Sequence, residues 1–168
     1  MSAVTGVQRQ TNLQQSLESP PSGYKVSLRE ILFTNNERKL KIMKLNPDCL
    51  RDVLLVVETN ASTSQWVEAK TLLDDPRMSS YSYEEIAYHV RQANWAGLLA
   101  EVNWFMDEGF LIKDLTPSGH QFLADIREDT NWNKVKSILK KVGSFSISAI
   151  TQAAAGVVQA DIQKHLGL

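Results

Sequence analysis

Residues 81–99, YSYEEIAYHVRQANWAGLL, decide how this chain folds. Apolar side chains recur there at the three- and four-residue spacing of a helix that buries one face, namely Ile86, Val90 and Ala93. The pattern stops at Gly97, and glycine is a frequent helix terminator. We therefore expect a helix over residues 83–96. Its outward face would carry Glu84, Tyr88, Arg91 and Trp95.

A β-hairpin is expected directly after this helix. Residues 98–105 and 110–115 have the pattern of two short strands. The turn between them consists of Met106, Asp107, Glu108 and Gly109. Upstream, Asn46-Pro47-Asp48 predicts a helix that ends near Asn60. Asn caps free backbone amides, Pro suits the first helical turn, and Asp complements the helix dipole.

The remaining elements follow from shorter signals. Apolar and polar side chains alternate over residues 65–72, which predicts a short strand. Asp74-Asp75-Pro76 starts a turn or a very short helix that ends near Tyr81. After the hairpin, Thr116-Pro117 starts a helix that reaches Ile126. Helical stripes then continue to Gly143 and from Ile147 to Leu166.

The order helix, strand, short helix, helix, hairpin, helix is that of winged-helix domains. We therefore expect an α+β fold, mainly α, with a winged helix-turn-helix-like domain over residues 43–126. Residues 127–168 would form a helical C-terminal extension and a candidate oligomerisation element, because the last helix has both a polar face and an Ala-rich apolar face.

Residues 1–42 have a different character. Their first half is rich in Gln, Ser and Thr and closes with Ser19-Pro20-Pro21-Ser22-Gly23, so we expect a disordered tail. The apolar core pattern begins abruptly at Met43. Glu37-Arg38-Lys39 is also what a purine-rich ribosome-binding site would encode upstream of that methionine. We hypothesise that Met43 is the native start and that residues 1–42 are an extension.

Three stretches carry a family resemblance: residues 43–58 (MKLNPDCLRDVLLVVE), residues 81–99, and residues 114–146 (DLTPSGHQFLADIREDTNWNKVKSILKKVGSFS). Together they resemble a family of uncharacterised proteins that is common in prophages and on bacterial chromosomes and is known only as a domain of unknown function. The resemblance covers nearly everything from Met43 onward, and family members usually begin at the matching methionine. It implies a small cytoplasmic mobile-element protein and brings no activity, cofactor or catalytic residue.

Composition places the chain among ordinary globular proteins. It has 168 residues, 43% hydrophobic and 22% charged, which is enough for one full hydrophobic core. No apolar run approaches the roughly 20 residues that span a bilayer. The single cysteine, Cys49, excludes an internal disulfide and favours a reducing cytoplasm.

The residue types that carry catalysis are scattered. His89, His120 and His165 lie far apart without metal-ligand spacing, and there is neither a phosphate-binding glycine loop nor a nucleophile elbow. We expect His89 to be a hydrogen-bonded structural residue, His120 to cap or pack, and Cys49 to be a small buried hydrophobe. The sequence therefore predicts no enzyme, no cofactor and no metal.

Charge is distributed unevenly along the chain. The net charge is −1, but residues 43–130 contain seven basic and fifteen acidic residues, while both flanks are basic. A DNA-reading helix needs cations to neutralise phosphates. The helix over residues 83–96 offers Arg91, with Gln92 as a base contact, and the turn brings the acids Asp107 and Glu108. Further nucleic-acid contacts would come from Lys134, Lys136, Lys140 and Lys141, which otherwise form a solvated helix face.

A protein partner suits the same surface better. Tyr, Trp and Arg are the residue types that anchor interfaces, and they gather on the outward helix face and the hairpin as Tyr88, Arg91, Gln92, Trp95, Trp104, Phe105 and Met106. Two alternatives stay open: the C-terminal helices could cover these groups as ordinary core, or the chain could be a sequence-specific DNA-binding regulator. The last helix is also a candidate for homodimer pairing. We expect no membrane binding, because Lys164 is the only Lys or Arg after residue 146.

Overall fold

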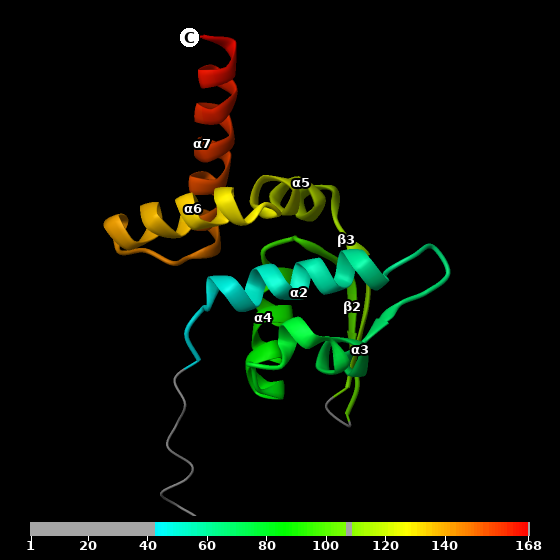
Figure 1. Ribbon diagram of the computed structural model, residues 1–168. Coiled ribbons are helices and arrows are strands. Elements are labelled where there is room, and N and C mark those ends of the chain that lie inside the picture. Colours follow the sequence, from blue (N-terminus) through cyan, green and yellow to red (C-terminus); the bar gives the residue numbers. More distant parts are fainter. Residues whose placement is uncertain (1–42, 107–108, 168) are drawn as a thin grey trace, which may run out of the picture. The chain divides into compact units, whose positions relative to one another are not determined.

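The fold begins with a helix that the sequence marks clearly. In this computed structural model, which describes residues 43–106 and 109–167, α2 spans Pro47–Asn60 (Figure 1). The side-chain oxygen of Asn46 accepts hydrogen bonds from the backbone N–H groups of Asp48 (3.1 Å) and Cys49 (3.5 Å). The predicted start and end of this helix are therefore confirmed. One face is buried, through Cys49, Leu50, Val53, Leu54, Val56 and Val57.

The chain divides into two units, residues 1–42 and residues 43–168. The predicted disordered tail and the hypothesis of a start at Met43 concern the first unit, which lies outside the described residues. The acids Asp107 and Glu108 of the predicted turn also lie outside them.

The strand predicted over residues 65–72 is mostly wrong. Strand β1 covers only Val67–Glu68, and the chain then forms helix α3, Ala69–Asp74, and the 3₁₀ helix η1, Pro76–Met78. The physical reason is the odd spacing between Val67 and Leu72, both of which are buried. A continuous strand would place them on opposite faces of the sheet, whereas the turn into α3 brings both into one core.

Helix α4, Tyr83–Trp95, confirms the central sequence prediction to within one residue. Ser82 caps it by accepting a hydrogen bond from the N–H of Glu85 at 3.3 Å. Its buried face carries Ile86, His89, Val90 and Ala93. After the helix, Gly97 adopts a left-handed conformation with φ of 71°, which turns the chain directly into the first strand of the hairpin.

The sheet has three antiparallel strands in the order β1-β3-β2. Strands β2, Leu99–Trp104, and β3, Phe110–Leu115, form the predicted hairpin, with Trp104 opposite Phe110 at the turn end. Strand β3 is central, because Val67 of β1 pairs with Ile112 on its other edge. The predicted class, α+β and mainly helical, is confirmed.

Three helices follow the hairpin: α5, Pro117–Ile126; α6, Asp129–Val142; and α7, Ile147–Leu166. They belong to the same hydrophobic core as α2 and the sheet, to which they contribute Phe122, Leu123, Ile126, Trp132, Val135, Leu139, Ile150, Ala154 and Val157. One core therefore runs across the predicted boundary at Ile126. The predicted stripe of α6 is only partly buried, since Ile138 and Val142 are exposed.

Among the residues described, none of the helices combines the length and the apolar character that crossing a bilayer requires.

Candidate partner-binding groove

A groove of about 450 Å³ lies between α4 and the end of β2. Its lining brings together residues that are distant in sequence: Met43, Tyr83, Glu84, Ala87, Tyr88, Arg91, Trp104 and Phe105. Four of the residues predicted to bind a partner therefore share one surface: Tyr88, Arg91, Trp104 and Phe105. Met43 contributes to the same groove, which the sequence pattern does not indicate.

The wall formed by Trp104 is held in place by two neighbours. Its ring packs on Phe110, with ring centroids 5.1 Å apart, and Phe110 in turn stacks with Tyr83 at 6.4 Å. The guanidinium carbon of Arg91 lies 4.6 Å from the centroid of the Trp104 ring. Phe110 is buried, so the aromatic wall is anchored to the core. The groove therefore offers a rigid aromatic wall, together with the cation of Arg91 and the carboxylate of Glu84.

Tyr88 is oriented by a buried histidine. Its ring meets that of His89 edge-on at 5.2 Å, and His89 is fully buried. The Nε2 atom of His89 accepts a hydrogen bond from the backbone N–H of Asn46 at 2.7 Å, and Nδ1–H donates to the carbonyl of Glu85 at 2.7 Å. Burial lowers the pKa of this imidazole. The structural role predicted for His89 is confirmed, and it ties α4 to the start of α2.

The other predicted contact residues lie outside the groove. Trp95 is 71% exposed at the end of α4, and Met106 is fully exposed at the hairpin turn. Gln92 is half-buried. Of the predicted residues that do line the groove, Phe105 is exposed. The C-terminal helices leave Trp95, Phe105 and Met106 in contact with solvent. The alternative in which those helices cover these side chains is therefore wrong.

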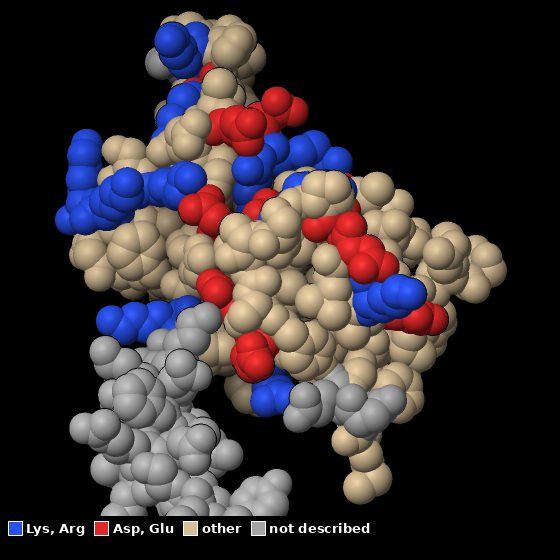
Figure 2. Space-filling model, turned by 60° about the horizontal axis from the view of Figure 1, so that its bottom comes forward, with Lys and Arg blue, Asp and Glu red and all other residues tan. Residues whose placement is uncertain are grey.

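The predicted lysine run on α6 is divided between two roles. Lys134 donates to both carboxylate oxygens of Asp161 (2.8 and 2.6 Å), and Lys136 donates to Asp48 at 2.9 Å. Lys140 and Lys141 are exposed in the last helical turn, where positive charge complements the helix dipole. Figure 2 shows Lys and Arg side chains along the left side of the molecule, where α6 lies in Figure 1.

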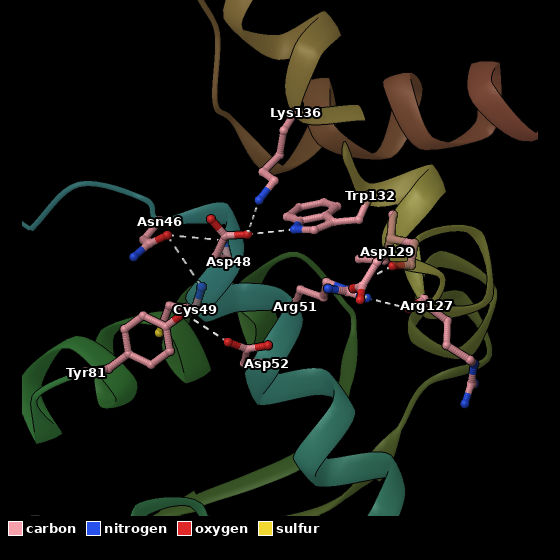
Figure 3. A network of polar contacts seen from close by, with 11 residues as sticks. Asn46, Asp48, Cys49, Arg51, Asp52, Tyr81, Arg127, Asp129, Trp132 and Lys136 are labelled. Carbon is pink, nitrogen blue, oxygen red and sulfur yellow. Dashed lines mark hydrogen bonds and ion pairs between the residues drawn. The ribbon is translucent and has the colours of Figure 1, made fainter. Parts of the chain in front are cut away.

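A polar network joins α2 to α6 (Figure 3), and the sequence analysis missed it. Asp48 accepts hydrogen bonds from the indole N–H of Trp132 (2.6 Å) and from Lys136. Partial burial alone would raise the pKa of Asp48, but these two hydrogen bonds hold it below the ordinary value. The sequence pattern indicates only that Asp48 complements the helix dipole. Its separation of 84 residues from Trp132 leaves no local signal for the contact.

Arg51 supports the junction between α5 and α6. Its guanidinium donates to the carbonyls of Ile126 (2.9 Å) and Arg127 and to the carboxylate of Asp129 (2.8 Å). These carbonyls end a helix and would otherwise lack partners. The guanidinium also lies over the ring of Trp132, at 5.7 Å from its centroid. The network therefore fixes the C-terminal helices against α2.

Next to this network, Cys49 and Tyr81 are held in their neutral forms. Burial, with Glu85 and Asp52 nearby, raises the pKa of the Cys49 thiol to about 12. Burial and the hydrogen bond that Tyr81 donates to Asp52 at 2.9 Å raise the pKa of the phenol. A thiol that stays protonated is a poor nucleophile. Cys49 is buried, as the sequence predicts.

The remaining histidines do not assemble a reactive cluster. His120 lies 3.6 Å from an oxygen of Glu58 and 3.7 Å from one of Asp114, on the surface. The Nδ1 atom of His165 lies 2.8 Å from the backbone carbonyl of Asp161, one helical turn earlier. Within residues 43–106 and 109–167, no group of three or more His, Cys, Asp or Glu side chains could hold a metal ion.

Comparison with known proteins places this chain in a family. A protein of Haemophilus influenzae (strain ATCC 51907 / DSM 11121 / KW20 / Rd), described as "Uncharacterized protein", is 30% identical over 119 residues, which cover 69% of this chain and 96% of that protein. No solved structure matches. The family model described as "Hypothetical protein (DUF2513)" matches residues 44–146, a segment that contains the groove except Met43 and the whole polar network. The chain belongs to the DUF2513 family.

Proposed function

We propose that this chain is a non-catalytic binding protein of the prophage or mobile-element type, and that the groove between α4 and β2 takes a segment of a protein partner. The observation that carries the proposal is the groove itself. It combines an aromatic wall fixed to the core with the cation of Arg91 at its edge. Aromatic and arginine side chains in a well-packed pocket are the usual anchors of protein interfaces.

The surface beside the groove supports a macromolecular partner. Trp95, Phe105 and Met106 are exposed apolar side chains on the end of α4 and on the hairpin. Phe105 and Met106 are neighbours along the chain and extend the apolar wall of the groove, and exposed apolar patches mark interaction sites. A partner that fills the groove with one anchor could cover this neighbouring surface with the residues on either side of it.

We further propose that residues 43–126 form a winged helix-turn-helix-like domain. Two features support this proposal: the element order α2, β1, α3, α4, β2, β3 and the antiparallel strand order β1-β3-β2. In this interpretation α4 is the helix that reads a partner and the β2–β3 hairpin is the wing. The groove would then lie between the reading helix and the wing.

The alternative is a sequence-specific DNA-binding regulator that uses Arg91 and Gln92 as readers and Lys140 and Lys141 as phosphate contacts. The exposed lysines at the end of α6 favour it. Charge argues against it, because α4 carries Glu84 and Glu85 in its first turn and Arg91 already lies over Trp104. Affinity for duplex DNA comes mainly from cations that neutralise phosphates.

The test begins with a display library of short peptides, selected against the immobilised full-length chain. Peptides that bind are measured by calorimetry against Tyr88→Ala and Phe105→Ala, with Lys141→Ala as the matched surface control. Truncating an anchor costs about 2 kcal/mol or more, so we expect affinity to fall roughly 30-fold in the groove variants and to stay unchanged in the control. Equal affinity for the groove variants would contradict the proposal. Circular dichroism checks that each variant is folded.

The same protein samples also test the alternative, a DNA-binding regulator. A gel shift with random duplex DNA at low and at physiological salt should show no complex if the groove is the functional surface. A complex whose affinity falls steeply with salt, and which the double variant Lys140→Ala/Lys141→Ala weakens, would instead establish the DNA-binding regulator.

A further inference from the structure

The second half of α7 is poorly packed. Residues 147–157 contribute Ile150, Ala154 and Val157 to the core, all buried. Further along, Ile162 is 54% exposed and Leu166 is 68% exposed. Figure 1 shows this half of the helix extending beyond α6. The end of α7 therefore still carries large apolar side chains, although it no longer packs into the core of its own chain.

The apolar residues of this segment lie on one side of the helix: Val158 is half-buried, and Ile162 and Leu166 are exposed. Val158, Ile162 and Leu166 are spaced by four residues, so they form a continuous stripe. A hollow of about 280 Å³ runs along this stripe and is lined by Asn131, Val158, Asp161, Ile162, His165 and Leu166. Space is therefore available on this side for another side chain or helix.

Most helical stability in proteins comes from packing an apolar face. The last turns of α7 continue a helix whose first part is packed, but the apolar side chains of Ile162 and Leu166 add little packing of their own within the chain. We therefore expect its apolar stripe to be covered in the functional protein.

The residues that flank the stripe indicate what covers it. Asp161 and His165 lie on one flank, and Gln159 and Gln163 lie on the other. If two copies of α7 pack antiparallel about a two-fold axis, each flank of one helix lies next to the same flank of the other helix. The residues of these two flanks then run in opposite directions. With Ile162 at the axis, His165 of one copy lies beside Asp161 of the other. The two-fold axis places two such pairs of Asp161 and His165 at the interface. On the opposite flank, Gln159 and Gln163 of one copy lie beside those of the other.

Within the described residues, the contacts of both side chains leave room for a further hydrogen bond. Asp161 accepts from Lys134, but a carboxylate has about four lone-pair sites and can accept from a second donor. Only Nδ1 of His165 is within hydrogen-bond distance of the carbonyl of Asp161. The apolar stripe also matches itself, because Val158 then faces Leu166 of the other copy. Self-complementarity of this kind favours a second copy of the same chain over an unrelated partner.

We propose that residues 158–166 of α7 form a docking surface for the same segment of a second copy, arranged antiparallel about Ile162. The proposal goes beyond the function assigned to the groove and does not depend on it. The two surfaces use different residues, and either can fail without the other.

Analytical ultracentrifugation of the full-length chain tests the proposal. We expect a reversible monomer–dimer equilibrium at micromolar concentration. Ile162→Glu should shift it to monomer, because a buried unpaired carboxylate is costly in an apolar interface. Lys164→Glu is the control, since Lys164 projects from the opposite side of the helix. A wild-type chain that stays monomeric, or a dimer that persists in Ile162→Glu, would overturn the proposal.

Disulfide cross-linking tests the antiparallel register. Helix axes that pack 8–10 Å apart bring facing Cα atoms within the range that a disulfide spans. Ile162→Cys should form a covalent dimer on mild oxidation, whereas Lys164→Cys should not. The native Cys49 is buried and does not compete. A covalent dimer that forms equally well in both variants would contradict the register.

Discussion

The imidazole of His89 accepts a hydrogen bond through Nε2 from the backbone N–H of Asn46, 43 residues earlier in the chain, at 2.7 Å. Asn46 in turn caps α2 and donates from its side-chain amide to Glu85 at 3.1 Å. The neutral tautomer of His89 that carries its proton on Nδ1 satisfies both ring nitrogens. One buried side chain therefore joins the start of α2 to α4, next to the groove.

This relationship makes stability depend on pH. Burial lowers the pKa of His89 below its ordinary value of about 6.5, so the unfolded chain takes up the proton first as pH falls. The contribution is fully present above pH ~6.5 and is lost as pH falls through the lowered value. His89→Leu should unfold more easily at pH 7.5 by about 1–3 kcal/mol, because the N–H of Asn46 loses its acceptor. Urea titrations from about pH 7.5 to 5 should show a smaller loss of stability for this variant than for the wild type.

Gly119 permits the close packing of α5 on the start of β2. A Cβ atom at this position would lie 2.1 Å from the carbonyl oxygen of Leu98. That oxygen is backbone and also accepts the N–H of Thr116, so it cannot move away cheaply. Gly119→Ala should therefore cost about 1–3 kcal/mol of unfolding free energy by overpacking. Ser118→Ala, on the exposed side of the same turn, should change it by less than about 0.5 kcal/mol. Equal stability of the two variants would refute this view of the contact.

Arg51 should be the most sensitive residue of the polar network. Its side chain is nearly buried and donates to two helix-end carbonyls and to Asp129. Arg51→Ala should lower thermal and urea stability by about 2–3 kcal/mol, because charged hydrogen bonds are lost and the partly buried carbonyl of Ile126 is left without its donor. Asp129→Asn removes only the exposed ion pair and should cost less than about 1 kcal/mol. If Asp129→Asn proved as costly as Arg51→Ala, the carbonyl contacts would not be the important ones.

Gly156 lies in the middle of α7 without a steric reason to be glycine. A Cβ atom added there meets nothing within 4 Å. Glycine inside a helix costs about 0.5–1 kcal/mol relative to alanine. Gly156→Ala should therefore raise the melting temperature by a few degrees. Ala155→Gly, at the neighbouring exposed position, should lower it by a similar amount.

Cys49 should be inert in the folded protein. Burial raises the pKa of its thiol to about 12, and the thiolate is the form that reacts. An Ellman assay at pH 8 should show negligible reaction under native conditions and one reactive thiol per chain in urea. Rapid labelling of the folded chain would contradict the buried position.

The sequence alone determined the elements whose signals are local. The start of α2 at Asn46-Pro47, the start of α5 at Thr116-Pro117 and the hairpin after Gly97 lie where the caps and turn residues place them. The burial of His89 follows from its place beside the buried stripe of α4. These features depend on neighbours within about one helical turn or along one strand, so a sequence pattern is sufficient to predict them.

Only the tertiary structure decided the features that join distant residues. It ended β1 after two residues to bury Leu72, brought Met43 and Phe105 into one groove, and paired Asp48 with Trp132. It also left Ile138 of α6 and Ile162 of α7 exposed, although both fit an apolar helical stripe. Periodicity shows which side chains share a face of a helix. What that face packs against depends on chain segments dozens of residues away, whose positions no local pattern encodes.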